Sequence, residues 1–149
     1  MTPAAIFDVD GTLCNVESVR HHLGVGVPGA KRDYNRFHEE SVNCPPHQWV
    51  VDRARWMAEQ DLGIIVVTAR KARWFNHTWW WLRENRVPFD ALHMRDDWDQ
   101  RPDYVVKKDI LERIRRRWEP VIAFDDNPAV IRLWEEEGIS TVRVPGWVG

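Results

Sequence analysis

Four aspartates stand in two tight groups, each directly after a short apolar run. Asp8 and Asp10 lie in the segment IFDVDGTL, and Asp125 and Asp126 lie in AFDDNP. A single acid in such a position is commonly a turn former or a helix cap, and that is the structural alternative for each one. Four carboxylates in one place would repel one another strongly unless a cation neutralised them. All four are therefore candidate metal-site residues, and an all-oxygen set indicates a hard ion, for which Mg2+ is the expected cofactor.

These residues must be positioned by strands and helices that alternate along the chain. Short apolar runs predict buried strands, and apolar residues at helical spacing predict helices between them. Strands that are apolar on both faces indicate a parallel sheet with helices on both sides. We predict an α/β, Rossmann-like fold of three layers, with a central parallel sheet of about five strands. The predicted strands cover residues 4–7, 64–67, 91–94, 121–124 and 141–144, and the predicted helices residues 50–58, 75–82, 110–118 and 130–134.

In a parallel sheet, ligands bind in the crevice outside the carboxyl ends of the strands. The second predicted strand ends at Thr68 and Arg70, whose hydroxyl and guanidinium groups suit phosphate oxygens. For Arg70 the alternative is a solvated surface charge. Asn127 is itself a good N-cap, so neither Asp125 nor Asp126 is needed for that role. Three strand ends are thus expected to bring their polar side chains to one site.

The composition is that of an ordinary globular chain, which we predict to form one domain over residues 1–149. With 44% hydrophobic residues, 30% charged residues and a formal net charge of -2, it differs from a generally basic nucleic-acid binder, so any basic site must be local. The sequence shows no signal pattern and no apolar run long enough to cross a bilayer, so we expect a cytoplasmic protein without a membrane partner. Cys14 and Cys44 are expected to be free thiols without a catalytic role.

Four motifs of the sequence resemble those of the haloacid dehalogenase (HAD) superfamily. They are DVDGT at the first strand, VVTAR at the second, a lysine before the fourth strand and FDDNP after it. More closely, VVTAR, RVPFDALHMR, RPDYVVKKDIL and AFDDNPAVIRLWEEEGI resemble the phosphatase domain of bacteriophage and bacterial polynucleotide kinase-phosphatases. The similarity spans nearly the whole chain, and it implies a HAD fold with phosphatase activity.

The resemblance implies a role for each residue of the first two motifs. Asp8 is the expected nucleophile, which forms an aspartyl-phosphate, and Asp10 is the expected acid and base. An aspartate at the second position is typical of the phosphatases of the superfamily, whereas the dehalogenases lack it. Backbone amides around Gly11 are expected to contact phosphate, and the carbonyl of Asp10 to contact the metal. Thr68 is expected to bind the transferred phosphoryl group.

Two lysines compete for the role of the motif lysine. Helical spacing places Lys107 on the apolar stripe of its helix and turns Lys108 towards solvent. A lysine on a buried stripe needs an anionic partner, which Asp8 with a bound phosphate would supply. The resemblance also selects Lys107. It further implies that one of Asp125 and Asp126 is a direct metal ligand, for which we favour Asp126, while the other holds a metal-bound water or the lysine.

The irregular stretch at residues 14–46 predicts a small insert, with a short helix near residues 33–40, that lies over the edge of the sheet. Lys31, Arg32 and Arg36 alternate there with Tyr34 and Phe37, a mixture typical of surfaces that bind single-stranded nucleic acid. A solvated helix face is the alternative reading. Arg32 and Arg36 are accordingly candidate substrate-binding residues. An insert this short is expected to leave the crevice open to the end of a polymer.

Together these patterns and the resemblance predict a Mg2+-dependent phosphatase that removes 3'-phosphates from DNA or RNA ends during nucleic-acid repair. One alternative is a phosphatase of small phosphomonoesters such as nucleotides. Another is a non-catalytic phosphate-binding module on the same fold, which would show no hydrolysis of a generic phosphomonoester. The sequence contains no GxxxxGK[ST] loop, so kinase activity is not expected, and a separate kinase or ligase is a candidate partner.

Overall fold

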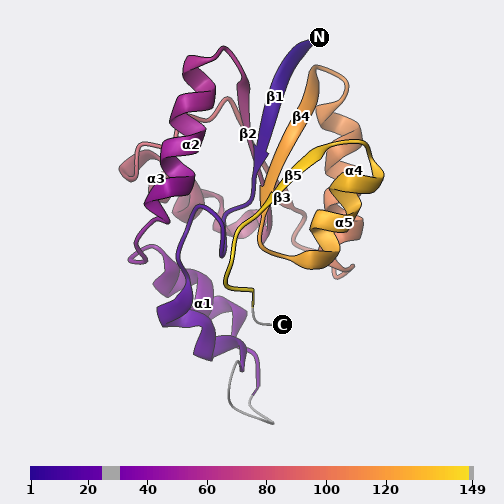
Figure 1. The fold of residues 1–149 in the computed structure, drawn as a ribbon. Coiled ribbons are helices and arrows are strands. Elements are labelled where there is room, and N and C mark those ends of the chain that lie inside the picture. The colour runs from indigo at the N-terminus through magenta and orange to yellow at the C-terminus, as the bar shows by residue number, and fades with distance from the viewer. Residues whose placement is uncertain (25–30, 148–149) are drawn as a thin grey trace.

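The computed structural model describes residues 1–24 and 31–147. Five parallel strands form one sheet in the order β3-β2-β1-β4-β5 (Figure 1). This arrangement confirms the predicted parallel sheet and places the first strand at its centre. The strands are β1 (Thr2–Phe7), β2 (Gly63–Lys71), β3 (Ala91–Arg95), β4 (Trp118–Asp125) and β5 (Ser140–Arg143).

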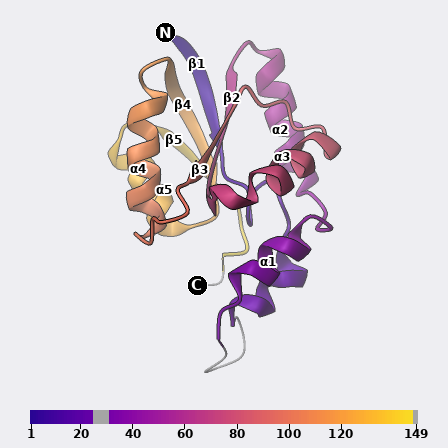
Figure 2. The ribbon, with the colours of Figure 1, turned by 180° about the vertical axis from the view of Figure 1, so that it is seen from behind.

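Helices cover both faces of the sheet, which completes the predicted three layers (Figures 1 and 2). One face carries α2 (Gln48–Glu59) and α3 (Phe75–Glu84), and the other carries α4 (Asp103–Ile114) and α5 (Pro128–Glu136). Among the described residues, none of the helices is long and apolar enough to span a bilayer.

The central strand shows why the chain adopts this sandwich. Ala5 and Phe7 point into the apolar core beneath α2 and α3, while Ala4 and Ile6 point into the core beneath α4 and α5. Phe7 stacks on Phe124 of β4, with 4.5 Å between the ring centroids. Because successive side chains of a strand point to opposite faces, a strand that is apolar at every position must be buried on both sides.

Two predicted helical stripes differ from the structure. Phe75 and Trp79, expected on the buried stripe of α3, are 44% and 42% exposed, whereas Trp81 is buried and its indole N–H donates to the carbonyl of Cys44 at 2.9 Å. The apolar residues of α3 run almost all the way round the helix, so their spacing does not define its phase. Trp118, expected at the end of a helix, instead begins β4.

The predicted insert at residues 14–46 contains the 3-10 helix η1 (Glu17–Leu23) and the helix α1 (Tyr34–Ser41). Residues 25–30 of the insert lie outside the described residues. Asp33 caps α1, because its side chain accepts a hydrogen bond from the N–H of Arg36 at 3.0 Å. The helix α1 lies beyond the carboxyl ends of the strands (Figure 1). A second short 3-10 helix, η2 (Ala72–Trp74), follows β2 at the same edge.

Candidate active site

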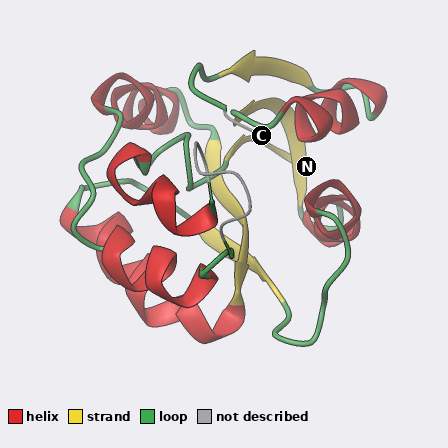
Figure 3. Ribbon diagram, turned by 90° about the horizontal axis from the view of Figure 1, so that it is seen from below, coloured by secondary structure: helices red, strands yellow, loops and turns green. Residues whose placement is uncertain are grey.

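The carboxyl ends of β1, β2 and β4 lie side by side at the edge of the sheet that faces α1 (Figure 3, seen from that side). Asp8 follows β1, Thr68 and Arg70 lie near the end of β2, and Asp125 closes β4. The backbone N–H of Asp8 donates to the carbonyl of Phe124 at 3.0 Å, which fixes the two central strand ends relative to each other. The structure therefore brings the predicted strand ends together.

Asp8 is buried at this edge, with 6% of its surface exposed. Its Oδ1 accepts a hydrogen bond from Nζ of Lys107 at 3.1 Å, and its Oδ2 accepts one from the hydroxyl of Thr12 at 3.2 Å. Burial and the nearby carboxylate of Asp125 raise the pKa of Asp8 well above its usual value, although Lys107 acts in the opposite direction. An ionised Asp8 thus requires more positive charge than Lys107 supplies.

Lys107 lies between the two central strand ends, as the helical phase predicts. Its side chain is buried, whereas Lys108 is exposed. Nζ of Lys107 is 2.7 Å from Oδ2 of Asp125 in addition to its contact with Asp8. Burial disfavours the ammonium ion, but the carboxylates of Asp125 and Asp8 outweigh it and raise the pKa of Lys107 above its usual value. The lysine is therefore a fixed positive charge within the site.

Three carboxylates share this space. One oxygen each from Asp8, Asp125 and Asp126 lies within 4.8 Å of the others, and all three residues are buried. Burial and the neighbouring Asp125 raise the pKa of Asp126 to about 7. A buried, oxygen-only set with an excess of negative charge fits a hard divalent cation, which would relieve the repulsion.

Asp125 and Asp126 differ in how free their oxygens are to bind such a cation. Oδ1 of Asp125 accepts a hydrogen bond from the backbone N–H of Asn127 at 3.0 Å, and its Oδ2 is taken by Lys107. Asp126 pairs with Arg20, whose Nη2 lies 3.8 Å from its Oδ2. Asp125 thus holds Lys107, and Asp126 as the direct metal ligand stays a prediction.

Gly11 is needed for this close approach. Its φ is +79°, and an added Cβ would lie 2.0 Å from Oδ2 of Asp126. That backbone amides around Gly11 contact phosphate stays a prediction; in this structure the N–H of Gly11 donates to the carbonyl of Cys14 at 2.8 Å. The N–H of Thr12 likewise donates to the carbonyl of Val9 at 3.1 Å. These two hydrogen bonds stabilise the tight turn after β1.

Asp10 and Arg70 form a two-pronged ion pair. Nε and Nη2 of Arg70 lie 3.0 Å and 2.6 Å from the two oxygens of Asp10, and Nη1 donates to the hydroxyl of Thr78 at 3.1 Å. Burial favours the neutral acid, but Arg70 outweighs it and lowers the pKa of Asp10. Arg70 was expected to bind substrate phosphate, whereas all three of its nitrogens contact protein groups here. The buried hydroxyl of Thr68 accepts from the N–H of Arg70 at 3.1 Å.

A cavity of about 710 Å3 opens over these side chains, and η1 and α1 form part of its wall. Arg32 lines it and donates to the hydroxyl of Tyr34 at 3.1 Å. The side chain of Arg36, the other predicted substrate-binding residue, is 65% exposed and pairs with Glu40, so the structure does not place it at the cavity. Arg32 precedes α1, whereas Arg36 lies in its first turn.

Several residues of the cavity wall are absent from the set that the sequence predicts. Further cations and aromatic rings surround the aspartates; they are Arg20, Lys71, Arg73, Arg101, Trp74 and Trp147. Lys71, Arg73 and Trp74 directly follow the TAR motif, so their place after a strand end was a signal that could have found them. Arg20 could not be found in this way, because it reaches the site from the insert.

His38 of α1 is a buried histidine in the same wall. Its ring lies 5.0 Å from that of Phe37 and 5.7 Å from that of Trp74, measured between centroids. Its Nδ1 is buried without a hydrogen-bond partner. Burial lowers the pKa of His38 to about 4, against the opposing charge of Asp10. Burial thus favours the neutral imidazole at neutral pH.

The fold and this site are those of a phosphatase of the haloacid dehalogenase type. The chain belongs to the family described as the polynucleotide kinase PNKP phosphatase domain, whose family model matches residues 2–146. The match covers the four motifs and all five strands.

Solved structures show the same fold. A chain in a structure of a Pnkp1/Rnl/Hen1 complex is 23% identical with a TM-score of 0.80, and the match covers 97% of this protein but 46% of that chain. A class C acid phosphatase from Bacillus anthracis with tungstate bound is 13% identical with a TM-score of 0.69, and the match covers 98% of this protein and 68% of that chain. A haloacid dehalogenase-like family hydrolase from Streptococcus pneumoniae is 13% identical with a TM-score of 0.65, and the match covers 95% of this protein and 84% of that chain.

Proposed function

We propose that this protein is a polynucleotide 3'-phosphatase that requires Mg2+ and forms an aspartyl-phosphate on Asp8. The observation that carries the proposal is the contact of Asp8 with Lys107, with Asp10 two residues further on and oriented by Arg70. A nucleophile, a fixed cation and an oriented acid are the groups that stepwise phosphoryl transfer needs. Membership of the PNKP phosphatase domain family supports the substrate class.

In the first step, a carboxylate oxygen of Asp8 attacks the phosphorus, and the bond from phosphorus to the 3'-oxygen breaks. Asp10 gives its proton to the leaving 3'-oxygen, so the product is a free 3'-hydroxyl. The incoming phosphate competes for Arg70 and weakens the charge that lowers the pKa of Asp10. Asp10 can therefore gain a proton on substrate binding, while Thr78 and Thr68 hold Arg70 and its backbone in place.

In the second step, Asp10 takes a proton from water, and the water oxygen attacks the phosphorus of the aspartyl-phosphate. The bond from phosphorus to Asp8 breaks, which restores the carboxylate and releases inorganic phosphate. Lys107 stays within hydrogen-bond distance of Asp8 and stabilises the charge in both steps. Asp8, Asp126 and the carbonyl of Asp10 would hold Mg2+, which supplies charge neutralisation for the phosphoryl oxygens when it is bound.

The cavity wall supports a nucleic-acid end as the substrate. Arg32 and Arg73 can contact backbone phosphates, and Tyr34 and Trp74 offer flat rings beside them. Arg101 also lines the cavity, but Asp99 and Asp109 hold its guanidinium. The overall charge of -2 means that this local group must supply the attraction. A few phosphate contacts give an affinity that weakens as salt is added.

A partner protein is part of the proposal. The related chain in the Pnkp1/Rnl/Hen1 structure is more than twice as long as the matched region and is part of a complex. We infer that the phosphatase acts beside a separate kinase or ligase; a ligase would join the ends that the phosphatase prepares.

The test is a comparison of three substrates in Mg2+: an oligonucleotide with a 3'-phosphate, the matching 3'-mononucleotide and an oligonucleotide with a 5'-phosphate. We expect the 3'-phosphorylated oligomer to have the highest kcat/KM, and added salt to narrow its advantage over the mononucleotide. If the mononucleotide is preferred at every salt concentration, the polynucleotide proposal is wrong and the substrate is a small phosphomonoester. No hydrolysis of any of them would indicate a non-catalytic phosphate-binding module.

A further inference from the structure

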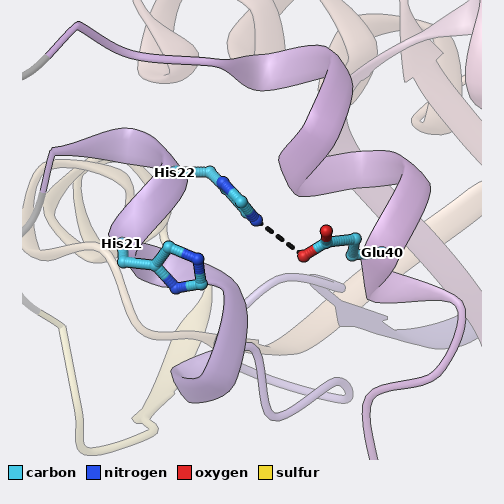
Figure 4. Close-up of side chains that lie close together, drawn as sticks. All are labelled: His21, His22 and Glu40. Atoms are coloured by element: carbon cyan, nitrogen blue, oxygen red, sulfur yellow. Dashed lines mark hydrogen bonds and ion pairs between the residues drawn. The ribbon is translucent and has the colours of Figure 1, made fainter.

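A second group of metal-ligand side chains lies in the insert, apart from the aspartates. His21 and His22 come from η1, and Glu40 comes from α1 (Figure 4). Nε2 of His22 is 2.6 Å from Oε2 of Glu40, and the rings of His21 and His22 are 3.9 Å apart between centroids. One ring nitrogen of each histidine and one carboxylate oxygen of Glu40 all lie within 4.8 Å of one another.

The donor types differ from those of the catalytic site. Two imidazoles and a carboxylate are borderline ligands that suit Zn2+ and related transition-metal ions, whereas the oxygen-only set of Asp8, Asp125 and Asp126 suits a hard ion. Tetrahedral Zn2+ with bonds of about 2.1 Å places its ligand atoms about 3.4 Å apart. The three donors can reach that spacing by small side-chain rotations, in which His22 and Glu40 separate slightly to admit the ion.

The backbone around the group is held in place. The N–H of Asp33 donates to the carbonyl of His22 at 2.6 Å, which ties the start of α1 to the end of η1. Nε of Arg36 lies 3.5 Å from Oε1 of Glu40, so this oxygen is occupied and Oε2 is the one directed at the histidines. Such an outer contact orients a ligating carboxylate.

An ordinary ion pair between His22 and Glu40 accounts for two of these residues but not for His21, whose ring lies against that of His22. We propose that His21, His22 and Glu40 form a Zn2+-type transition-metal site that clamps η1 to α1. The two joined elements carry Arg20 and His38 into the wall of the catalytic cavity. The metal would thus stabilise that wall without taking part in phosphoryl transfer.

The test is a titration of the metal-free protein with Co2+, followed by displacement with Zn2+, in excess Mg2+. We expect one ion per chain, with an absorption band typical of tetrahedral Co2+ that includes nitrogen ligands. His21→Ala and Glu40→Gln should each weaken binding about 10- to 100-fold. His77→Ala and Glu39→Gln are the matched controls, because they remove a histidine outside the insert and the neighbouring glutamate of α1, and they should bind as the parent protein does.

Two further measurements make the outcome decisive. The Asp126→Asn variant should keep the Co2+ absorption band. Loss of the band in this variant would show that the ion sits at the aspartates and overturn the proposal. Equal affinity in His21→Ala, or no binding by the parent protein, would also overturn it. Zn2+ should slow amide hydrogen exchange of residues 17–24 and 34–41 in the parent but not in Glu40→Gln. Unchanged exchange on binding would contradict the clamp.

Discussion

At the scale of residues, the main feature of the site is that each charged group is held by another. Arg70 binds both oxygens of Asp10, and Lys107 binds both Asp8 and Asp125. Ion pairs that are this well buried fix the positions of their side chains, because breaking one leaves an uncompensated charge. The proposed acid, Asp10, and the proposed nucleophile, Asp8, are therefore positioned before substrate binds.

Asp10→Asn tests the acid role. An amide cannot give a proton to a leaving alkoxide, so kcat for a 3'-phosphorylated oligonucleotide should fall by about 100-fold or more. A nitrophenyl phosphate needs less help from an acid, so its first step should lose less. The two substrates should be compared in the parent and in the variant, and equal losses for both would contradict the acid role.

Lys107→Ala tests the fixed cation. Removing a charge that stabilises the transition state should lower kcat by about 100- to 1,000-fold. Lys108→Ala is the matched control, because Lys108 is its exposed neighbour on α4, and it should retain nearly full activity. Turnover of both variants should be measured with their melting temperatures, and a larger loss in Lys108→Ala would contradict the assignment.

At the scale of elements, the tight turn after β1 decides whether Asp126 can approach Asp8. Gly11→Ala should destabilise the protein by more than about 2 kcal/mol, because a left-handed residue gains a Cβ and that Cβ collides with Asp126. Gly138→Ala is the matched control, since Gly138 also has a φ of +79° but no atom within 4 Å of the added Cβ. It should cost roughly 1 kcal/mol.

Urea denaturation of both glycine variants gives the comparison. The difference between them isolates the collision from the backbone conformation. Equal destabilisation would show that the contact between Gly11 and Asp126 does not matter for folding.

The elements also show how far the sequence predicts the structure. The strands were predictable because parallel strands buried on both faces are continuous apolar runs, and their ends carry the aspartates. The contact of Arg70 with Thr78 was not predictable, since Thr78 lies on the next helix and its direction depends on how α3 packs. The predicted phase of α3 was wrong for a related reason. Phe75 and Trp79 look like core residues, but Trp81 is the buried one, and its indole N–H donates to the carbonyl of Cys44.

At the scale of the whole molecule, the three clustered aspartates, Asp8, Asp125 and Asp126, lie where β1 and β4 end at the centre of the sheet. Their repulsion in the absence of a cation opposes folding, so a cation that binds the folded state should stabilise the whole domain. Metal binding thus offsets the free-energy cost of bringing the three carboxylates together.

Removal of Mg2+ tests this link. At about 100 times its Kd, Mg2+ adds about 2.7 kcal/mol of stability, which corresponds to about 5 to 10 °C in Tm for a chain of this size. A chelator should reverse the shift. Asp126→Asn should lose the shift and, without metal, melt no lower than the parent, because one carboxylate is gone. A shift of the same size in that variant would exclude Asp126 from the metal site.

The most direct test of the proposed mechanism is the turnover of Asp8→Asn on a 3'-phosphorylated oligonucleotide in Mg2+. An amide is too poor a nucleophile to form the phosphorylated intermediate, so phosphate release should fall by at least ~1000-fold. The variant should remain folded, with a Tm close to that of the parent, because asparagine has nearly the shape of aspartate. Phosphate release near the parent rate by this folded variant would contradict an aspartyl-phosphate on Asp8.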